Sequence, residues 1–353
     1  MKNNSPCRCR SNVAVILYFL FIAIFLSSCA LAKVKTPPKD SLFYFSDFVM
    51  GVKVEMTLRS SDVTLASEAA EDAFREMKRL DSKLSNWKED SEISKINKAS
   101  PTEWIPVSDD MFEVLSEALK LSESTNGAFD ITVGKLLSLW NFYSGEPSLP
   151  PEEKQKEAMQ YVGYKLVELD REKKMLRFRK SGVEIDLGGI GKGYILGRGY
   201  EVLREKGISA GLINGAGDVY VWGKKPDKSL WNIAVHDPIN PNVPLAILPV
   251  TDAAIFTSGD YERKFEKEGK VFHHIFDPRT GTSATGCHGV TIIAENIEGS
   301  NGLSSSVFIL GPKQGKAFID KLTDTEAIIF SSDGKVILSE NFRKKFPDIR
   351  FSR

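Results

Sequence analysis

The order in which strand and helix patterns follow one another constrains the fold of this chain more than any single motif. Residues Val52 to Arg59 alternate strictly between apolar and polar side chains, which indicates a half-buried strand. The next segment, Ser61 to Leu84, carries apolar side chains at helical spacing and predicts a long amphipathic helix. A second helix is expected to begin at the capping residues Ser108 or Asp109 and to end at Asn126-Gly127.

Strand patterns dominate the second half of the chain. A strand expected at Val183 to Leu187 runs into a glycine loop and then into a helix through Tyr200 to Lys206. From Gly211 onward the patterns are mostly strands, interrupted by predicted helices around Leu303 to Leu310 and Lys313 to Leu322. Because strands and helices intermix without regular βαβ alternation, an α+β fold is favoured over a doubly wound sheet.

Length and charge set further bounds. The 353 residues allow one large domain or two smaller ones. Lys plus Arg and Asp plus Glu each number 47, so no net charge directs the chain to nucleic acid or to an acidic membrane surface. We therefore expect no nucleic-acid partner.

The N-terminus carries a targeting signal. Its apolar run from Val13 to Leu26 is short for a transmembrane helix and matches a signal peptide. The run leads into Leu-Ser-Ser before Cys29, which resembles the lipobox of bacterial lipoproteins; the alternative is an ordinary signal peptide with an incidental cysteine. We expect residues 1–28 to be removed, a lipidated Cys29 to anchor the chain to a membrane, residues 29–41 to form a tether and residues 42–353 to form the folded domain.

Cysteine content agrees with export. Cys7 and Cys9 lie in the segment expected to be removed, so only Cys287 remains besides the lipidated residue. An intramolecular disulfide and a cysteine-based metal site are therefore excluded. Cys287 is expected to be a buried thiol rather than a nucleophile.

The segment from Phe272 to Gly281 concentrates chemically active side chains. Two consecutive histidines, His273 and His274, precede Asp277 in an Asp-Pro-Arg-Thr-Gly turn. A strand that ends in a turn can present an imidazole, a carboxylate and a guanidinium to one spot, which suits proton transfer beside an anionic substrate. The alternative is a simple turn, since Asp, Pro and Gly are common turn residues.

A glycine-rich segment, Asp186 to Tyr194, follows the predicted strand and opens a helix. Its glycines allow close backbone approach to a phosphate, the helix N-terminus supplies N–H donors, and Lys192 adds a positive charge. The segment is neither a P-loop nor a GxGxxG fingerprint. A tightly packed strand-to-helix turn is the alternative.

Two more segments could present polar groups. The turn Asn214 to Asp218 is either a hairpin or a loop that admits a ligand, and Thr257 to Tyr261 ends a strand, where active sites often form. The isolated His236 and His288 are expected to be structural.

Taken in order, these segments resemble the FAD:protein FMN transferases, the ApbE family of periplasmic lipoproteins. The resemblance runs from about Phe45 to Gly311. Its pieces are Met50-Gly51, Leu84 to Asn97, Phe129 to Gly134, Asp186 to Tyr194, Asn214 to Asp218, Thr257 to Arg263 and His273 to Gly281.

The resemblance implies both an activity and a fold. The enzyme would bind FAD with a divalent metal, usually Mg²⁺, and move FMN onto a Thr or Ser of a partner protein with release of AMP. Partners would be membrane redox subunits, such as those of sodium-pumping NADH:quinone reductase, on the periplasmic side of a bacterial envelope. The implied fold is α+β, a duplicated T-fold-like arrangement of mixed sheets and flanking helices.

Site residues follow from the resemblance. The FAD site would be lined by Met50, Trp87, Ala128, Phe129, Asp130, Asp186, Lys192 and Ile275. The face of Trp87 suits flavin stacking, and Lys192 would stabilise charge on the leaving AMP. His274 is the candidate base because the ordinary pKa of histidine lies near working pH, and Asp277 is expected to orient it or to bind substrate.

The expected metal site departs from the family pattern. The family places an Asp, and four residues later a Thr, on one face of a helix. Here the aligned residues are Asn301 and Ser305, and the third ligand would be the Gly189 carbonyl. Because Mg²⁺ prefers carboxylate ligands, we expect Asn301 to weaken metal binding.

Two other functions compete with FMN transfer. The first is an FAD-binding protein or an FAD pyrophosphatase that yields FMN and AMP. The second is a lipid-anchored binding protein without catalysis. A nicotinamide-dependent dehydrogenase is disfavoured, because the glycine loop lacks the fingerprint spacing.

Overall fold

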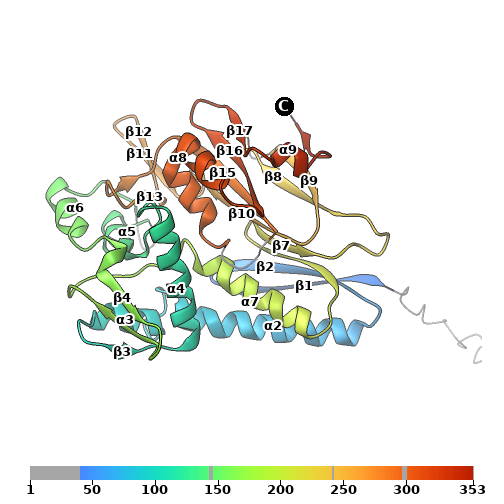
Figure 1. Cartoon of the computed structure of the whole chain (residues 1–353), viewed down its shortest axis with the longest axis horizontal. Helices are drawn as coiled ribbons and strands as arrows, with labels where there is room; N and C mark the ends of the chain where they lie inside the picture. Colours follow the sequence, from blue (N-terminus) through green and yellow to red (C-terminus); the bar gives the residue numbers. More distant parts are fainter. Residues whose placement is uncertain (1–39, 143–145, 241, 296–299, 353) are drawn as a thin grey trace, which may run out of the picture. The chain divides into compact units, whose positions relative to one another are not determined.

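An antiparallel sheet with strand order β1-β2-β6-β7-β10-β15-β16-β17 forms the centre of the computed structural model, which describes residues 40–142, 146–240, 242–295 and 300–352 (Figure 1). The described residues belong to one unit that begins at Asp40, close to the expected domain start. Its strands are β1 (Ser41–Val49), β2 (Val52–Ser60), β6 (Ala210–Gly215), β7 (Asp218–Trp222), β10 (Ala253–Gly259), β15 (Cys287–Ala294), β16 (Thr325–Ser331) and β17 (Val336–Leu338).

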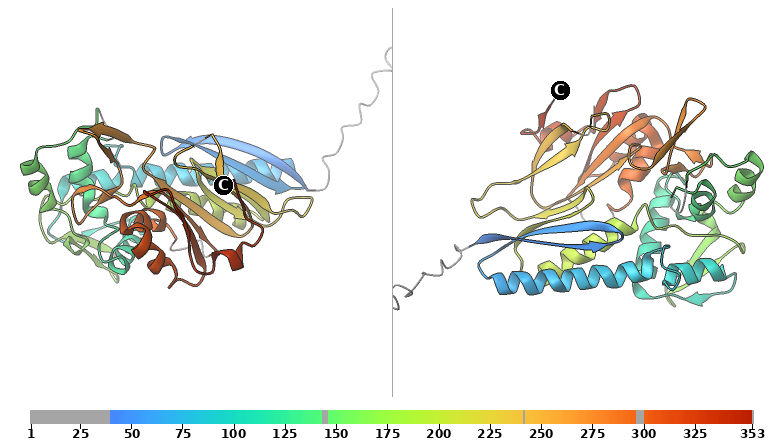
Figure 2. Two further views of the ribbon diagram at one scale, coloured as in Figure 1. Left: turned by 90° about the horizontal axis from the view of Figure 1, so that it is seen from above. Right: turned by 180° about the vertical axis from the view of Figure 1, so that it is seen from behind.

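Helices cover one face of this sheet. They are α2 (Val63–Leu84), α7 (Gly191–Glu205) and α8 (Leu303–Ile319), with α2 and α7 side by side below the β1–β2 hairpin (Figures 1 and 2). The Asp62 carboxylate accepts a hydrogen bond from the Thr64 N–H at 2.8 Å and so caps α2. The amphipathic pattern over residues 61–84 therefore predicted this helix correctly.

A small sheet covers part of the opposite face. It has the order β18-β9-β8, with strands β18 (Arg350–Phe351), β9 (Pro244–Val250) and β8 (Trp231–His236). Along β7, Tyr220 and Trp222 belong to the core beneath the helices, whereas Val219 and Val221 belong to the core beneath this sheet. The strand is buried on both faces, which explains why its sequence is almost entirely apolar.

Smaller elements surround one end of the central sheet. The helices are α3 (Glu92–Ala99), α4 (Asp109–Ser124), α5 (Gly134–Trp140) and α6 (Glu152–Met159), with 3₁₀ turns at Ile131–Val133 and Tyr164–Leu166. Helix α9 (Phe342–Lys345) lies elsewhere, beside β8 and β9, and Phe342 belongs to the core beneath that small sheet (Figure 1). The strands are β3 (Ile105–Pro106), β4 (Val167–Asp170), β5 (Met175–Phe178), β11 (Lys264–Lys267), β12 (Lys270–His273), β13 (Phe276–Asp277) and β14 (Thr282–Ser283). Mixed helices and antiparallel sheets confirm the α+β expectation.

The predicted strand at residues 183–187 is wrong. This segment pairs with no neighbouring strand, and its backbone groups bond to side chains and to the turn at residues 131–134. The Asp186 N–H donates to the Ile131 carbonyl at 2.7 Å, and the Glu184 carbonyl accepts from the Gly134 N–H at 3.2 Å. The Ile185 N–H donates to the Asn97 side-chain oxygen at 2.8 Å, and the Ile185 carbonyl accepts from the Asn86 and Asn97 amides at 2.8 Å. Apolar periodicity cannot distinguish a buried segment without strand pairing from a strand of a β-sheet.

The two helices predicted after residue 303 form a single element with a break. Within α8, Gly311 has φ 75° and Pro312 follows it, so the helical conformation is interrupted where two helices were expected. Cys287 at the start of β15 is buried, as predicted.

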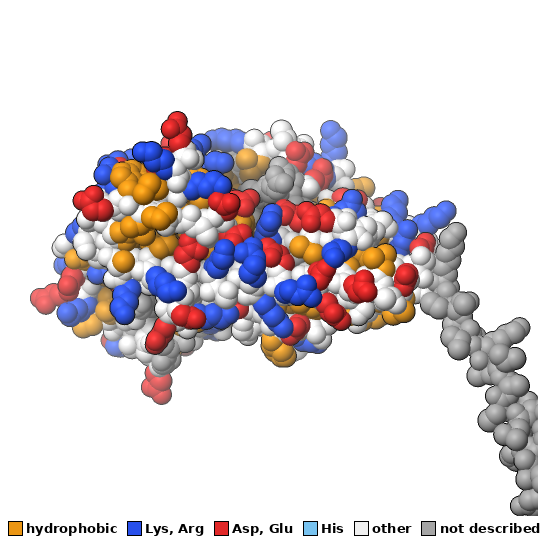
Figure 3. Space-filling model, turned by 90° about the horizontal axis from the view of Figure 1, so that it is seen from below, with side chains coloured by type: hydrophobic (Ala, Val, Ile, Leu, Met, Phe, Trp, Pro, Cys, Tyr) orange, Lys and Arg blue, Asp and Glu red, His pale blue; other side chains and the backbone are white. Residues whose placement is uncertain are grey.

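On the face seen in Figure 3, side chains of both charge signs are interspersed, in keeping with the balanced composition. Within the part of the chain that the structure describes, no helix has the length and apolar character needed to span a bilayer.

Candidate active site

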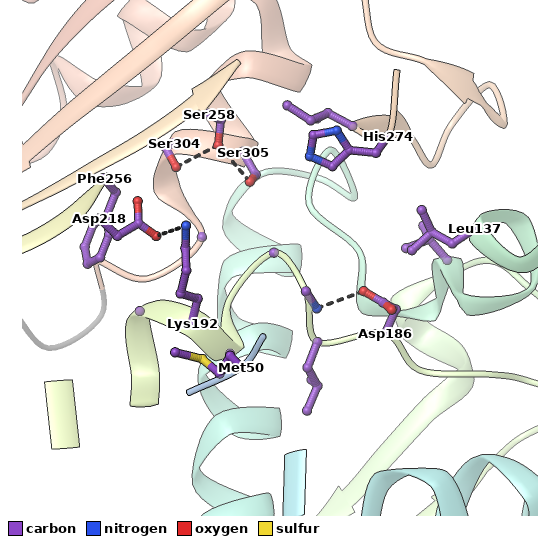
Figure 4. A pocket seen from close by; sticks show the side chains of 18 of the residues that line it. Met50, Leu137, Asp186, Lys192, Asp218, Phe256, Ser258, His274, Ser304 and Ser305 are labelled. Atoms are coloured by element: carbon purple, nitrogen blue, oxygen red, sulfur yellow. Dashed lines mark hydrogen bonds and ion pairs between the residues drawn. The ribbon is translucent and has the colours of Figure 1, made fainter. Parts of the chain in front are cut away.

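A cavity of about 340 Å³ opens where several element ends meet, and it falls in the usual size range of small-molecule sites (Figure 4). Its wall combines the β1–β2 turn, the end of α2, the glycine loop before α7, the start of β7, the end of β10, the loop after β12 and the start of α8. Every glycine-rich or polar motif singled out in the sequence contributes to this one wall.

Two helix N-termini face the cavity. Gly191, Lys192 and Gly193 of the first turn of α7 line it, as do residues 304 and 305 of the first turn of α8. The N-cap residues, Ile190 and Gly302, provide no side-chain cap. The Gly191 N–H donates to the Leu187 carbonyl at 2.7 Å and the Leu303 N–H to the Ser300 carbonyl at 3.3 Å. The positive ends of two helix dipoles nevertheless converge on the same space, which favours an anion.

Lys192 adds a cation between these helix ends. Its ammonium lies 3.1 Å from a carboxylate oxygen of Asp218, and Figure 4 shows the two side chains pointing toward each other. Asp218 is buried and also accepts a hydrogen bond from the Thr257 N–H at 3.2 Å. Burial raises the pKa of the Asp218 carboxyl, and the Lys192 ammonium opposes this effect.

Three serine hydroxyls line the cavity close to one another. The Ser258 hydroxyl at the end of β10 lies 2.9 Å from that of Ser304 and 3.1 Å from that of Ser305 (Figure 4). Each hydroxyl can donate or accept, so together they can bond to oxygens of a bound anion.

The two consecutive histidines have different surroundings. His273 is buried: its Nε2 lies 2.9 Å from the Ala284 carbonyl oxygen, and its Nδ1 accepts from the Ile275 N–H at 3.3 Å. These contacts fix the Nε2-protonated tautomer and hold the loop. The side chain of His274, by contrast, lines the cavity.

His274 has an electrostatic environment that disfavours its cation. Burial, together with the positive charge of Arg263, lowers the pKa of His274 to about 4. Arg263 itself lines the cavity, and its carbonyl accepts a hydrogen bond from the His274 N–H at 3.2 Å. The imidazole is therefore neutral near pH 7 and can accept a proton.

The expectation for Asp277 has to be revised. Its carboxylate accepts bonds from the Arg279 guanidinium at 2.8 and 2.7 Å and from the Arg279 N–H at 2.9 Å. Its carbonyl accepts from the N–H groups of Thr280 and Gly281. Asp277 does not line the cavity, so the structure assigns it to shaping the turn that follows His274.

Asp186 and Asp130 also line the cavity. Asp186 accepts from the Gly188 N–H at 2.8 Å and from the Asn86 amide at 3.3 Å, and burial raises its pKa. The Asp130 carboxylate accepts from the Thr132 hydroxyl and N–H at 2.6 and 2.8 Å. Its second oxygen accepts from the Tyr164 N–H at 2.6 Å, so this side chain mainly caps the local turns.

The other predicted FAD-site residues divide into two groups. Met50, Trp87, Phe129 and Ile275 line the cavity, and Trp87 is 60% exposed, so one of its ring faces is accessible. Ala128 is fully buried and supports the wall from behind.

The three expected metal ligands do not share the cavity wall. Gly189 and Ser305 line it, but Asn301 lies behind it with both polar atoms of its amide hydrogen-bonded to protein groups. Among the described residues, no group of three or more His, Cys, Asp or Glu side chains could hold a metal ion. Two of the three expected ligands therefore share the wall, without a carboxylate between them, and no reaction step below is derived through a metal.

Sequence reasoning missed several residues of the wall. They are Asn86, Asp218, Ser258, Glu262, Arg263 and Ser304. Asp218 and Arg263 end two of the segments named above, so a signal was present. What the sequence did not show is that both end at the same cavity. His236 and His288 do not line it, and His288 instead pairs with Asp260 at 2.7 Å.

Comparison with known proteins identifies the class of this α+β protein. The ApbE family model matches residues 50–329, which is more than half of the chain. The chain therefore belongs to the ApbE family.

Individual relatives agree. An FAD:protein FMN transferase of Klebsiella pneumoniae is 29% identical over 87% of this chain and 95% of its own length. The structure of an ApbE protein from Thermotoga maritima is similar with a TM-score of 0.80 and 34% identity, over 87% of this chain and 99% of that one. The flavinyl transferase ApbE of Pseudomonas stutzeri has a TM-score of 0.78 and 26% identity, over 87% and 98%. The expected ApbE-like architecture is thereby confirmed.

Proposed function

We propose that this protein is an FAD:protein FMN transferase that moves FMN from FAD to a Thr or Ser hydroxyl of an acceptor protein and releases AMP. One observation carries the proposal: a neutral imidazole and an anion-binding surface face each other across one cavity. The surface consists of Lys192 and the α7 and α8 N-termini, and the imidazole is that of His274.

The reaction needs a base and an anion site. The acceptor oxygen bonds to the FMN-side phosphorus while the anhydride bond breaks, and AMP leaves with that electron pair. His274 takes the hydroxyl proton, a role that its lowered pKa allows because the ring is unprotonated beforehand. The negative charge of the bound diphosphate raises this pKa, which makes the imidazole a stronger base in the complex.

We assign the positioning of the diphosphate to the part of the cavity wall that faces His274. Lys192, the N–H groups of the first turns of α7 and α8 and the three serine hydroxyls can neutralise phosphate oxygens. Asp218 keeps Lys192 in the cavity before FAD arrives. The exposed ring of Trp87 is the surface on which we place the isoalloxazine.

Use of Mg²⁺ forms a further part of the proposal. A bound cation would supply charge neutralisation at the diphosphate. From this chain, the Gly189 carbonyl and the Ser305 hydroxyl line the cavity and could contribute to holding it. Because Asn301 lies outside the wall, we expect weak binding of the metal when FAD is absent.

Export and membrane anchoring are proposed from the sequence alone. The signal peptide and Cys29 lie in residues 1–39, outside the described residues. A lipid on Cys29 would keep the domain at the periplasmic surface of a membrane, where a redox subunit such as that of a sodium-pumping NADH:quinone reductase could serve as acceptor. Mass spectrometry of the mature N-terminus tests the lipid anchor. A mature chain that begins at a residue other than Cys29 and carries no lipid would exclude it.

The transfer assay combines purified protein, FAD, Mg²⁺ and an acceptor domain that carries the target Thr. Covalent flavin is measured by in-gel fluorescence and by a mass increase of the acceptor. We expect labelling by the wild type and by His236→Ala, which changes an exposed histidine outside the cavity, and about 10²- to 10⁴-fold slower labelling by His274→Ala.

The same assay separates the competing functions. Free FMN and AMP without labelled acceptor would indicate a pyrophosphatase, and unchanged FAD would indicate a binding protein. An acceptor with Thr replaced by Ala must remain unlabelled, because the hydroxyl oxygen forms the new bond.

A further inference from the structure

Asn301 occupies a buried position between three elements. It precedes α8 and is 6% exposed. Its amide N–H donates to the Glu117 carboxylate of α4, at 3.2 Å from Oε1 and 3.5 Å from Oε2. On its other side, the Tyr220 hydroxyl of β7 lies 3.3 Å from the Asn301 Oδ1 and 2.9 Å from the Gly193 carbonyl oxygen. Both polar atoms of the amide are therefore used within the protein.

The first turn of α7 packs directly against this amide. A Cβ placed on Gly193 would overlap the Asn301 Oδ1, so any other residue there would force the Asn301 side chain to shift. Gly193 follows Lys192, the cation of the cavity. Asn301 consequently ties the start of α8 and the α7 turn that carries Lys192 to α4 and β7.

The neighbouring carboxylate determines which residue fits at position 301. An amide offers an N–H donor to the Glu117 carboxylate, whereas an ionised Asp offers only acceptors. With Asp at 301, two carboxylates would face each other at the 3.2–3.5 Å now spanned by a hydrogen bond. Like charges at that separation in a partly buried place destabilise the folded state.

From these contacts we infer that Asn301 is a positioning residue and not a metal ligand, and that Glu117 carries the negative charge that the family pattern places at position 301. In this chain the carboxylate is on α4, and the amide precedes α8. The charge lies outside the cavity wall, so a cation in the cavity has no carboxylate from residue 301.

The inference concerns packing and can be tested without FMN transfer. The melting temperature is measured in EDTA at pH 8 for Asn301→Asp, Glu117→Gln, the double variant and the control Glu123→Gln, an exposed residue of the same helix. We expect Asn301→Asp to lower the melting temperature by about 5 °C, and the control to leave it unchanged. In the double variant at least half of the loss should be recovered, because the amide of residue 117 then donates to the carboxylate at 301.

The inference would be overturned if Asn301→Asp melted in EDTA at the wild-type temperature or above it. It would also be overturned if adding Glu117→Gln to Asn301→Asp did not recover the lost melting temperature. If Asn301→Asp does not fold, the double variant still tests the inference. The inference requires that the double variant folds and that its melting temperature is close to that of Glu117→Gln.

Calorimetric titration of Mg²⁺ without FAD gives an independent answer. We expect no difference between the wild type and Asn301→Ala, because the amide of residue 301 lies outside the cavity wall. Loss of a measurable wild-type Mg²⁺ affinity in Asn301→Ala would show that Asn301 is a ligand after all.

Discussion

The pH dependence of flavin transfer tests the assignment of His274 as the base. The pKa of this imidazole is lowered to about 4 by burial and by the positive charge of Arg263, whereas that of an exposed histidine lies near 6.5. A base works in its unprotonated form. A lowered pKa therefore moves the acid limb of the rate profile to lower pH and leaves the enzyme active in mild acid.

The two pKa values predict very different neutral fractions of the imidazole at pH 5.5. There about 97% of an imidazole with a pKa of 4 is neutral, against about 9% of one with a pKa of 6.5. Because kcat/KM reports the free enzyme, kcat/KM for FAD at pH 5.5 should stay close to its value at pH 7.5. With an ordinary histidine it would be about tenfold lower. The acid limb of kcat should lie at higher pH than that of kcat/KM, since the bound diphosphate raises the pKa.

The assay measures initial rates of covalent labelling between pH 5 and 8 at saturating acceptor and varied FAD. Circular dichroism at each pH checks that the protein remains folded. An acid limb of kcat/KM near pH 6.5 would refute the buried, cation-flanked description of His274. Undiminished labelling by His274→Ala would refute its role as the base.

Three further substitutions probe the cavity. Lys192→Met removes the cation from the anion site, so FAD affinity should fall about 10- to 100-fold in calorimetric titration, and an unchanged Kd would exclude contact with the diphosphate. Trp87→Ala should weaken FAD binding about 2- to 10-fold. The melting temperature should hardly change, because the side chain is 60% exposed. Equal quenching of flavin fluorescence by the wild type and by Trp87→Ala would argue against stacking. Gly193→Ala forces a methyl group against the Asn301 amide and should lower the free energy of unfolding by about 1–3 kcal/mol. The control Gly191→Ala should lower it less, because a Cβ there meets its nearest neighbour at 3.6 Å. Equal urea midpoints of the two variants would contradict this packing.

Local patterns predicted much of the fold. The alternation over residues 52–59, the apolar spacing over 61–84 and the cap at Ser108 each depend on neighbouring residues in the chain, and each element formed as expected. The strand predicted at 183–187 failed because Asn86 and Asn97, far away in sequence, bind its backbone. No local pattern records those partners.

The candidate site shows the same division. The family resemblance pointed to His274 as the base, and of the two consecutive histidines only His274 lines the cavity. Asp277 was expected beside the base because it is close in sequence, yet its carboxylate is bonded to Arg279. Asp218 was overlooked because its partner, Lys192, is brought to it only by the packing of α7 against the sheet.

By itself, the sequence determined the α+β class, the family resemblance and the chemical types available for phosphate chemistry, because these depend on composition, spacing and motif order. Tertiary structure decided which side chains share a cavity and what charge each one carries there, because burial and distance set both. The same amide at position 301 looked like a weakened metal ligand in the sequence. Only the fold shows Glu117 at 3.2 Å, and a carboxylate at that distance requires a hydrogen-bond donor.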